Sequence, residues 1–345
     1  MTDPRARVQG LHRAVRSGLG GSDGSEHTCP VVFTRSSKDR PFRDGTDRAP
    51  EPDHQGDAGV TAGAAMPWRR YVALGDSFTE GLWDIPGHAP PPSAETADPN
   101  LRCRGWADLL AAHLAERTDE PVLYGNHAIR GRLLGPILRE QGPAALELSP
   151  DLVSLVGGGN DMLRPVADPD AMAAGLEDAV VRLRAAGATV LLGTGVDVRD
   201  SPVVKRTRPR VAVLNSHIWS IAQRHDAHVL DLWGMRSLRD WRMWAPDRIH
   251  LTTDGHRRVA QAALVALGLE PDDPDWDDPL APLPPLPRAA RARQDAEWLR
   301  THVYPWATRR LRGRSSGDLR EAKQLELAPV EPVGYDPLGV TARRG

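Results

Sequence analysis

The chain reads RRYVALGDSFTEG from Arg69 to Gly81. The apolar run from Tyr71 to Leu74 is typical of a buried strand, and the Gly-Asp-Ser that follows it is typical of a turn into a helix. A serine at this place presents its hydroxyl beside backbone N–H groups at the edge of a sheet. The same serine would also serve as a helix N-cap, and the tripeptide alone does not decide between these roles.

Apolar runs alternate with helical patterns along the rest of the chain. The predicted strands cover residues 71–74, 121–125, 152–156, 189–192 and 228–232. The predicted helices cover residues 104–117, 133–147, 169–186, 209–226 and 254–267, and Thr253 is the predicted N-cap of the last one. This alternation predicts an α/β fold in which a five-stranded parallel sheet lies between two layers of helices. In such a fold, ligands bind at the carboxyl ends of the strands.

Glycines and polar residues follow several of these strands. Residues 124–131 read YGNHAIRG, and residues 156–161 read VGGGND. Asp247 and His250 form the only Asp-x-x-His of the chain. A nucleophilic serine needs a base within hydrogen-bond reach, and that base needs a partner that fixes its tautomer. One loop that carries Asp and His three residues apart can supply both groups.

These blocks, in this order, resemble the SGNH (GDSL-type) hydrolase family over roughly residues 69–268. The resemblance implies a flavodoxin-like three-layer sandwich. It also implies that Ser77 is the nucleophile, that His250 is its general base, and that Asp247 holds the His250 ring.

The resemblance further implies an oxyanion hole made by the N–H groups of Ser77 and Gly131 and by the amide of Asn160. Ala128 stands where many members of the family have glycine. The implied activity is hydrolysis of a small or medium acyl ester through an acyl-serine intermediate, with no metal and no cofactor.

Other functions remain open at this point. Thioesterase and carbohydrate-deacetylase activities belong to the same reaction class, and an acyltransferase would use the same fold. An alternative of another class is a non-catalytic binding module that acts through an arginine-rich tail. The binding-module hypothesis is weaker, because a site that had lost its catalytic activity would have no physical reason to keep Ser77, Asp247 and His250 together.

Composition divides the chain into three parts. Residues 1–65 are rich in charge and glycine and contain none of the ten tryptophans, so we expect a disordered extension. Met66 directly precedes the first strand and is an alternative start. Residues 66–269 form the predicted hydrolase domain. Residues 270–345 form a Pro- and Arg-rich tail with one helix near 289–303. Packing of this helix onto the domain through Trp298, Leu299 and Trp306 is favoured over a basic arm that binds a partner.

Charge and cysteine content exclude several classes of protein. The net charge of -2 argues against a nucleic-acid partner. Two cysteines, Cys29 and Cys103, exclude a disulfide scaffold and a cysteine-based zinc site. No apolar run reaches the ~18 residues of a membrane span, and no apolar signal region is found, so we expect a cytoplasmic protein with a small-molecule ester as its partner. The oligomeric state is not predicted.

A few further side chains could belong to the site. Arg130 and Arg164 flank the predicted oxyanion residues and could bind an acidic substrate group, although pairing with nearby carboxylates is favoured. Trp83 and Trp244 could line a pocket. His256 falls in the last helix, where an exposed position is favoured over a role in the site.

Overall fold

The computed structural model describes residues 66–85, 103–201, 203–312, 315–318 and 320–330. The predicted extension over residues 1–65, including the question of the start at Met66, lies outside the described residues. The end of the predicted tail, residues 331–345, lies outside them as well.

The described residues form a six-stranded sheet in the order β5-β4-β3-β1-β2-β6. Its first five strands in the chain are parallel, and their order is that of flavodoxin-like folds. The strands are β1 (Arg70–Gly75), β2 (Leu123–Asn126), β3 (Leu152–Val156), β4 (Thr189–Gly193), β5 (His228–Leu230) and β6 (Gln324–Pro329). The predicted α/β class is therefore confirmed, but the sheet has six strands rather than five, because β6 from the tail adds antiparallel to β2.

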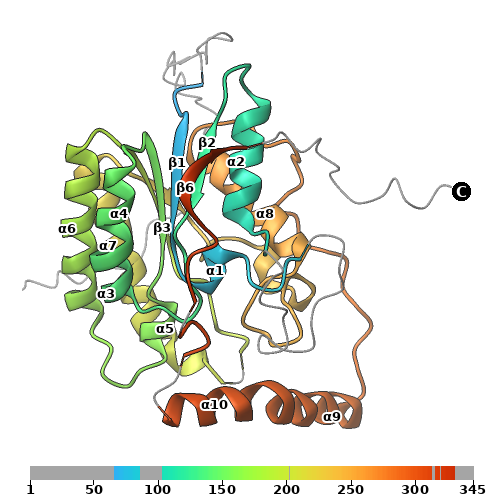
Figure 1. Cartoon of the computed structure of the whole chain (residues 1–345). Helices are drawn as coiled ribbons and strands as arrows, with labels where there is room; N and C mark the ends of the chain where they lie inside the picture. The colour runs from blue at the N-terminus through green and yellow to red at the C-terminus, as the bar shows by residue number, and fades with distance from the viewer. Residues whose placement is uncertain (1–65, 86–102, 202, 313–314, 319, 331–345) are drawn as a thin grey trace, which may run out of the picture. The chain divides into compact units, whose positions relative to one another are not determined.

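Successive residues of β1 point to opposite faces of the sheet, and each face is covered by helices. Tyr71 and Ala73 pack in one cluster with α2 (Trp106–Glu116) and α8 (Thr253–Ala266). Val72 and Leu74 pack in another with α6 (Pro169–Ala185) and α7 (Arg208–His225). Figure 1 shows these two helical layers on either side of the sheet.

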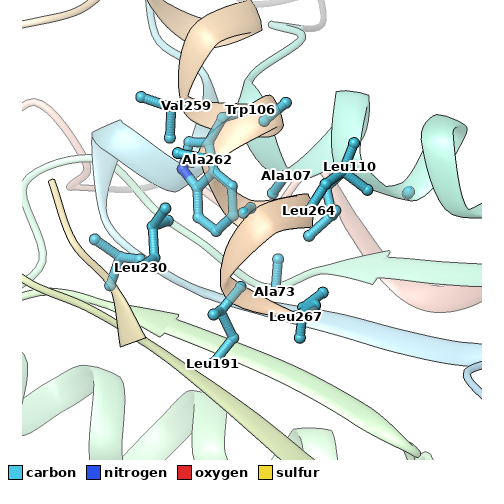
Figure 2. Packing of buried hydrophobic residues seen from close by; sticks show 14 of the residues in the cluster. Ala73, Trp106, Ala107, Leu110, Leu191, Leu230, Val259, Ala262, Leu264 and Leu267 are labelled. Atoms are coloured by element: carbon cyan, nitrogen blue, oxygen red, sulfur yellow. The ribbon is translucent and has the colours of Figure 1, made fainter. Parts of the chain in front are cut away.

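Trp106 is one of the largest side chains of the first cluster. Its side chain is fully buried between α8 and the sheet, where Figure 2 shows it beside Val259 and Leu230. Because packing on this face fixes α2 and α8 against the strands, it also fixes the loops at the carboxyl ends of those strands.

The remaining helices are short or follow the predicted ranges closely. Residues 134–147 form one helical segment with a π-helical centre. The N-cap of α8 is Thr252 rather than the predicted Thr253, because the Thr252 side chain accepts from the N–H of Gly255. The other helices are α1 (Ser77–Glu80), α3 (Leu134–Pro136), η1 (Ile137–Gln141), α4 (Gly142–Glu147), α5 (Gly159–Met162), η2 (Lys205–Thr207), η3 (Ser237–Arg239) and η4 (Trp241–Met243).

The described part of the tail contains more structure than the one expected helix. It begins with α9 (Arg288–Trp298) and continues through the π-helical η5 (Leu299–Val303) into α10 (Tyr304–Leu311), before it reaches β6. Lys323, just before β6, donates to the carbonyl oxygens of Glu80 and Cys103 at 2.8 and 2.9 Å and to Asp108 at 2.6 Å. These contacts join the tail to α1 and to α2 with the segment that precedes it.

Candidate active site

Strand register brings the first and third sequence blocks together. Gly75 at the end of β1 pairs with Val156 at the end of β3. The residues that follow these strands, among them Ser77 and Asn160, therefore reach the same edge of the sheet. Both of these residues line one pocket.

Ser77, His250 and Asp247 form a continuous hydrogen-bonded chain. Ser77 Oγ lies 2.8 Å from His250 Nε2, and His250 Nδ1 lies 2.6 Å from Asp247 Oδ2. A carboxylate can only accept, so Nδ1 of the His250 ring carries the proton and donates a hydrogen bond to Asp247. In the neutral ring, Nε2 is then an acceptor for the hydroxyl of Ser77, which is the arrangement a general base requires.

Asp247 is buried and is held by its own loop. Its Oδ1 accepts from the backbone N–H groups of Ile249 and His250, both at 3.0 Å. Burial by itself raises the pKa of Asp247, but the His250 charge and these hydrogen bonds more than offset it, so the pKa lies below its ordinary value. Asp247 is therefore kept ionised opposite the imidazole.

Asn160 is oriented by two acceptors. Its Nδ2 donates to Asp76 Oδ2 and to the carbonyl oxygen of Arg132, both at 3.1 Å. Asp76 also caps α1 by accepting from the N–H of Phe78 at 3.0 Å. Burial raises the pKa of Asp76 to about 6, although the Phe78 N–H and the His250 charge act in the opposite direction. An oxyanion in the site would have to share one of the two N–H groups of Asn160.

Gly131 follows β2 in a conformation that only glycine adopts freely. Its φ is 76°, and a Cβ built on it would lie 2.0 Å from Ser315 Oγ in the tail. The turn around Ser315 therefore packs directly on the loop that carries this predicted oxyanion residue. Ser77, the third predicted contributor, opens α1, where the first N–H groups have no partner within the helix.

A largely apolar pocket of about 210 Å³ lies beside Ser77 and Asn160. Its wall comes from the ends of β3 and β4 and from the segment before His250. The apolar side chains that line it include Val156, Met162, Val198, Val211, Leu232 and Trp241. A pocket of this kind accommodates an apolar group attached to a carbonyl that sits at Ser77.

Of the other side chains that the sequence offered for the site, some line the pocket and others lie elsewhere. Arg130 pairs with Glu80, which also accepts from the Arg130 backbone N–H at 2.8 Å, so this arginine is engaged away from a substrate. Trp244 lines the pocket, whereas Trp83 is buried in a separate small cluster. The expectation of an exposed His256 is wrong: the ring is buried, and its Nδ1 accepts from the N–H of Trp106 at 3.2 Å.

One group in the described part of the chain could offer three ligand atoms to a metal ion, namely His113, Glu116 and Asp272. Asp272, however, already lies 2.7 Å from His113 Nδ1 and 2.7 Å from Arg117 Nη2. A guanidinium on the same carboxylate competes with a cation, so this group is a salt-bridge network. None of its members lines the pocket at Ser77.

Two parts of this site were not predicted from the sequence. Asp76 stands inside the Gly-Asp-Ser block, and its N-cap position was the available signal for its contact with the third block. The second is the contact of Trp298, whose Nε1–H donates to the carbonyl oxygen of Asp247 at 2.9 Å. The sequence predicts that Trp298 packs on the domain, which its burial confirms, but not that it contacts Asp247. This contact joins residues 51 positions apart, which no local pattern encodes.

Comparison with known protein families gives a match over the middle of the chain. A family model described as GDSL-like Lipase/Acylhydrolase family matches residues 73–258, which is just over half of the chain. No curated protein sequence matches the chain. Among the described helices, none is long and apolar enough to cross a bilayer.

Solved structures similar to the chain include several hydrolases. LAE5, an alpha/beta hydrolase enzyme from the metagenome of Lake Arreo in Spain, is 26% identical, with 57% of this chain and 94% of that chain covered at a TM-score of 0.45. A variant of Axe2, an acetyl xylan esterase from Geobacillus stearothermophilus, is 20% identical, with 59% and 95% covered at a TM-score of 0.47. TesA is 22% identical, with 57% and 97% covered at a TM-score of 0.43.

The family match spans the blocks that carry Ser77, Gly131, Asn160, Asp247 and His250. The chain belongs to the GDSL-like lipase/acylhydrolase family and is a hydrolase that acts on esters.

Proposed function

We propose that this protein hydrolyses carboxylic esters through an acyl-serine formed on Ser77. The observation that carries the proposal is the chain of hydrogen bonds from Ser77 Oγ through His250 to Asp247, at 2.8 and 2.6 Å, beside an apolar pocket. A hydroxyl, a base and a buried carboxylate in this order are the parts of a serine hydrolase.

The reaction proceeds in two displacements. His250 Nε2 takes the proton from Ser77 Oγ as the oxygen attacks the acyl carbonyl carbon, and it returns the proton to the leaving alcohol. The bond between Ser77 and the acyl carbon then holds the acyl group on the enzyme. A water molecule, deprotonated by the same nitrogen, attacks that carbon. The bond from the carbon to Ser77 Oγ then breaks, the acid leaves, and His250 returns the proton to Ser77 Oγ. Asp247 stabilises the imidazolium in both halves without taking up its proton.

The N–H groups of Ser77 and Gly131 and the amide of Asn160 stabilise the negative charge of the tetrahedral intermediates. The contact between Asp76 and Asn160 supports this role, because it orients the amide before substrate arrives. Losing one such donor costs about 2.7–4 kcal/mol of transition-state stabilisation.

The pocket favours an apolar group next to the ester carbonyl. Valine, leucine, methionine and tryptophan side chains contribute to its walls, and its volume of about 210 Å³ exceeds what an acetyl group fills. We therefore assign it to a medium-length acyl chain, since burying apolar surface there contributes to binding in proportion to chain length.

The alternative of a binding module acting through the tail predicts loss of function on deleting residues 288–345. That deletion does not distinguish a binding module from a serine hydrolase. It also removes β6, which pairs with β2, and the turn at Ser315 that packs against Gly131. Replacing Ser77 alone does separate them, since it leaves the tail intact.

The test is hydrolysis of p-nitrophenyl esters from acetate to palmitate by the full chain and by Ser77→Ala. The proposal expects turnover that peaks at a medium chain length and falls to background in the variant. Turnover that survives in Ser77→Ala, or a folded parent that hydrolyses none of these esters, would contradict it. Adding acceptor alcohols and analysing the products separates hydrolysis from acyl transfer.

A further inference from the structure

The turn that carries Asp247 and His250 contains a strained residue. Arg248 has a φ of 58°, in the left-handed region. A Cβ makes this region unfavourable, and arginine lacks the short polar side chain with which Asn or Asp adapts to it. Such a conformation persists where surrounding contacts hold it.

Helix α9 of the tail supplies contacts of this kind. Asp295 Oδ1 lies 2.7 Å from Arg248 Nη1. The Arg248 guanidinium lies 4.8 Å from the centroid of the Trp298 ring. Trp298 Nε1–H donates to the carbonyl oxygen of Asp247 at 2.9 Å. One helix therefore holds both the strained residue and the backbone of the one before it.

These contacts are not equally strong. The ion pair is partly exposed, with 24% of the Arg248 and 44% of the Asp295 side chain accessible, and such pairs contribute little. Trp298 is only 6% exposed, and its hydrogen bond to Asp247 is buried. A buried acceptor that loses its donor is far more costly than a surface pair that opens, so the indole N–H is the decisive contact.

We propose that Trp298 is a positioning residue for ester hydrolysis, and that it holds the 247–250 turn in the geometry that aligns His250 with Ser77. The inference rests on the proposed function and adds the tail to its machinery. Trp298 does not line the pocket, whereas Arg248 does, so Trp298 acts on the site only through Asp247 and Arg248. Its loss should therefore lower kcat and leave KM unchanged.

The test uses Trp298→Phe in the full chain, which keeps an aromatic ring beneath Arg248 and removes the N–H donor. We expect kcat for a p-nitrophenyl ester to fall about tenfold at unchanged KM, as displacements of a catalytic group by a fraction of an ångström do. The matched control is Arg300→Ala, which breaks an exposed pair with Glu297 on the same helical segment and should leave both constants at the parent values.

A second readout does not depend on turnover. The proton between His250 Nδ1 and Asp247 Oδ2 gives a downfield NMR signal, which should move or broaden in Trp298→Phe and stay in place in Arg300→Ala. A parent without Ser77-dependent turnover would overturn the proposed function, while this signal would still decide the role of Trp298. Parent-like kcat and an unmoved signal in Trp298→Phe would overturn the inference.

Asp295→Asn covers the case in which Trp298→Phe does not fold. It removes the partly exposed charge that pairs with Arg248 and leaves the Trp298 packing in place. Its expected effect is a fall in kcat of about two- to threefold, in line with the strength of a surface pair. Because the pair is weak, the downfield signal is the deciding readout for this variant: a parent-like kcat together with an unmoved signal would count against the role of α9 in holding the turn.

Discussion

Asp76 Oδ2 lies 3.1 Å from Asn160 Nδ2, so the residue before the candidate nucleophile orients the amide of the candidate oxyanion hole. The two residues are 84 positions apart and meet because β1 and β3 are neighbours in the sheet. This contact means that the first and third sequence blocks act as one unit.

The first prediction concerns this contact. Asp76→Asn would place an N–H group against either the Phe78 N–H or the Asn160 amide, so one of its two hydrogen bonds is lost. We expect kcat to fall at least tenfold, while Asn160→Ala should lose about 10²-fold, as removal of an oxyanion donor does. Steady-state kinetics on one ester measures both.

The two effects should also be coupled. In the double variant, Asp76→Asn should add little to the loss that Asn160→Ala causes, because the carboxylate acts through the amide. Full additivity of the two losses would show that Asp76 contributes by another route.

A second prediction concerns the pocket. Val198 is half-buried in its wall, and Val198→Phe would fill part of the space that we assign to the acyl chain. The ester chain-length optimum should move to shorter acyl groups, with kcat/KM for the acetate ester kept within a few fold of the parent.

The control for the pocket is Val213→Phe, because Val213 is exposed on α7. This variant should keep the parent profile across the same ester series. An unchanged profile in Val198→Phe would show that the acyl chain lies elsewhere.

Gly131 gives a third prediction. Gly131→Ala meets Ser315 Oγ at 2.0 Å and also imposes a left-handed φ of 76° on an alanine. The variant should lose both activity and free energy of unfolding. Adding Ser315→Ala should recover the steric part and leave a deficit of about 1–2 kcal/mol for the backbone conformation.

Chemical denaturation measures these free energies, and Gly142→Ala is the matched control. Nothing lies within 4 Å of a Cβ at Gly142, so this change should be neutral or slightly stabilising. If Ser315→Ala recovers nothing, the tail does not pack on the Gly131 loop as described.

His256 gives a prediction for pH. Burial lowers the pKa of His256 from 6.5 to about 4, so between these values the unfolded chain binds a proton that the folded protein does not. Its contribution to stability is therefore complete above pH 6.5 and is lost as pH falls towards 4. His256→Asn should remove this loss, which amounts to at most about 3 kcal/mol.

The measurement is the free energy of unfolding at pH 4 and pH 7 for the parent and for His256→Asn. Asp76 acts in the opposite direction, because its raised pKa of about 6 makes the folded state the better proton binder between pH 3.8 and 6. The difference between parent and variant cancels this contribution. Equal pH dependence in the two proteins would contradict the role of His256.

Much of the sheet could be predicted from the sequence, because its parallel strands are short apolar runs that stand alone between polar segments. The range 152–156 agrees with β3 to the residue, and its five side chains are all buried. The sixth strand escaped prediction for a physical reason. Gln324–Pro329 is an edge strand of modest apolar content, and its pairing with β2 lies about 200 positions away in the chain.

The residues of the candidate site also fall into two groups, those that a local sequence pattern predicts and those whose contacts depend on packing. Ser77, Asp247 and His250 could be predicted because each stands in a local pattern, and the structure brings them together. The buried state of His256 could not, since whether a helix face meets solvent or α2 depends on packing. Trp298 likewise acquires its contact with Asp247 only through the path of the tail.

The most direct measurement of the central claim is peptide mapping by mass spectrometry after incubation with a fluorophosphonate. We expect one adduct, on Ser77, that forms in the parent, forms far more slowly in His250→Gln and is absent in Ser77→Ala. Ester turnover by a folded protein whose Ser77 remains unmodified under these conditions would contradict it.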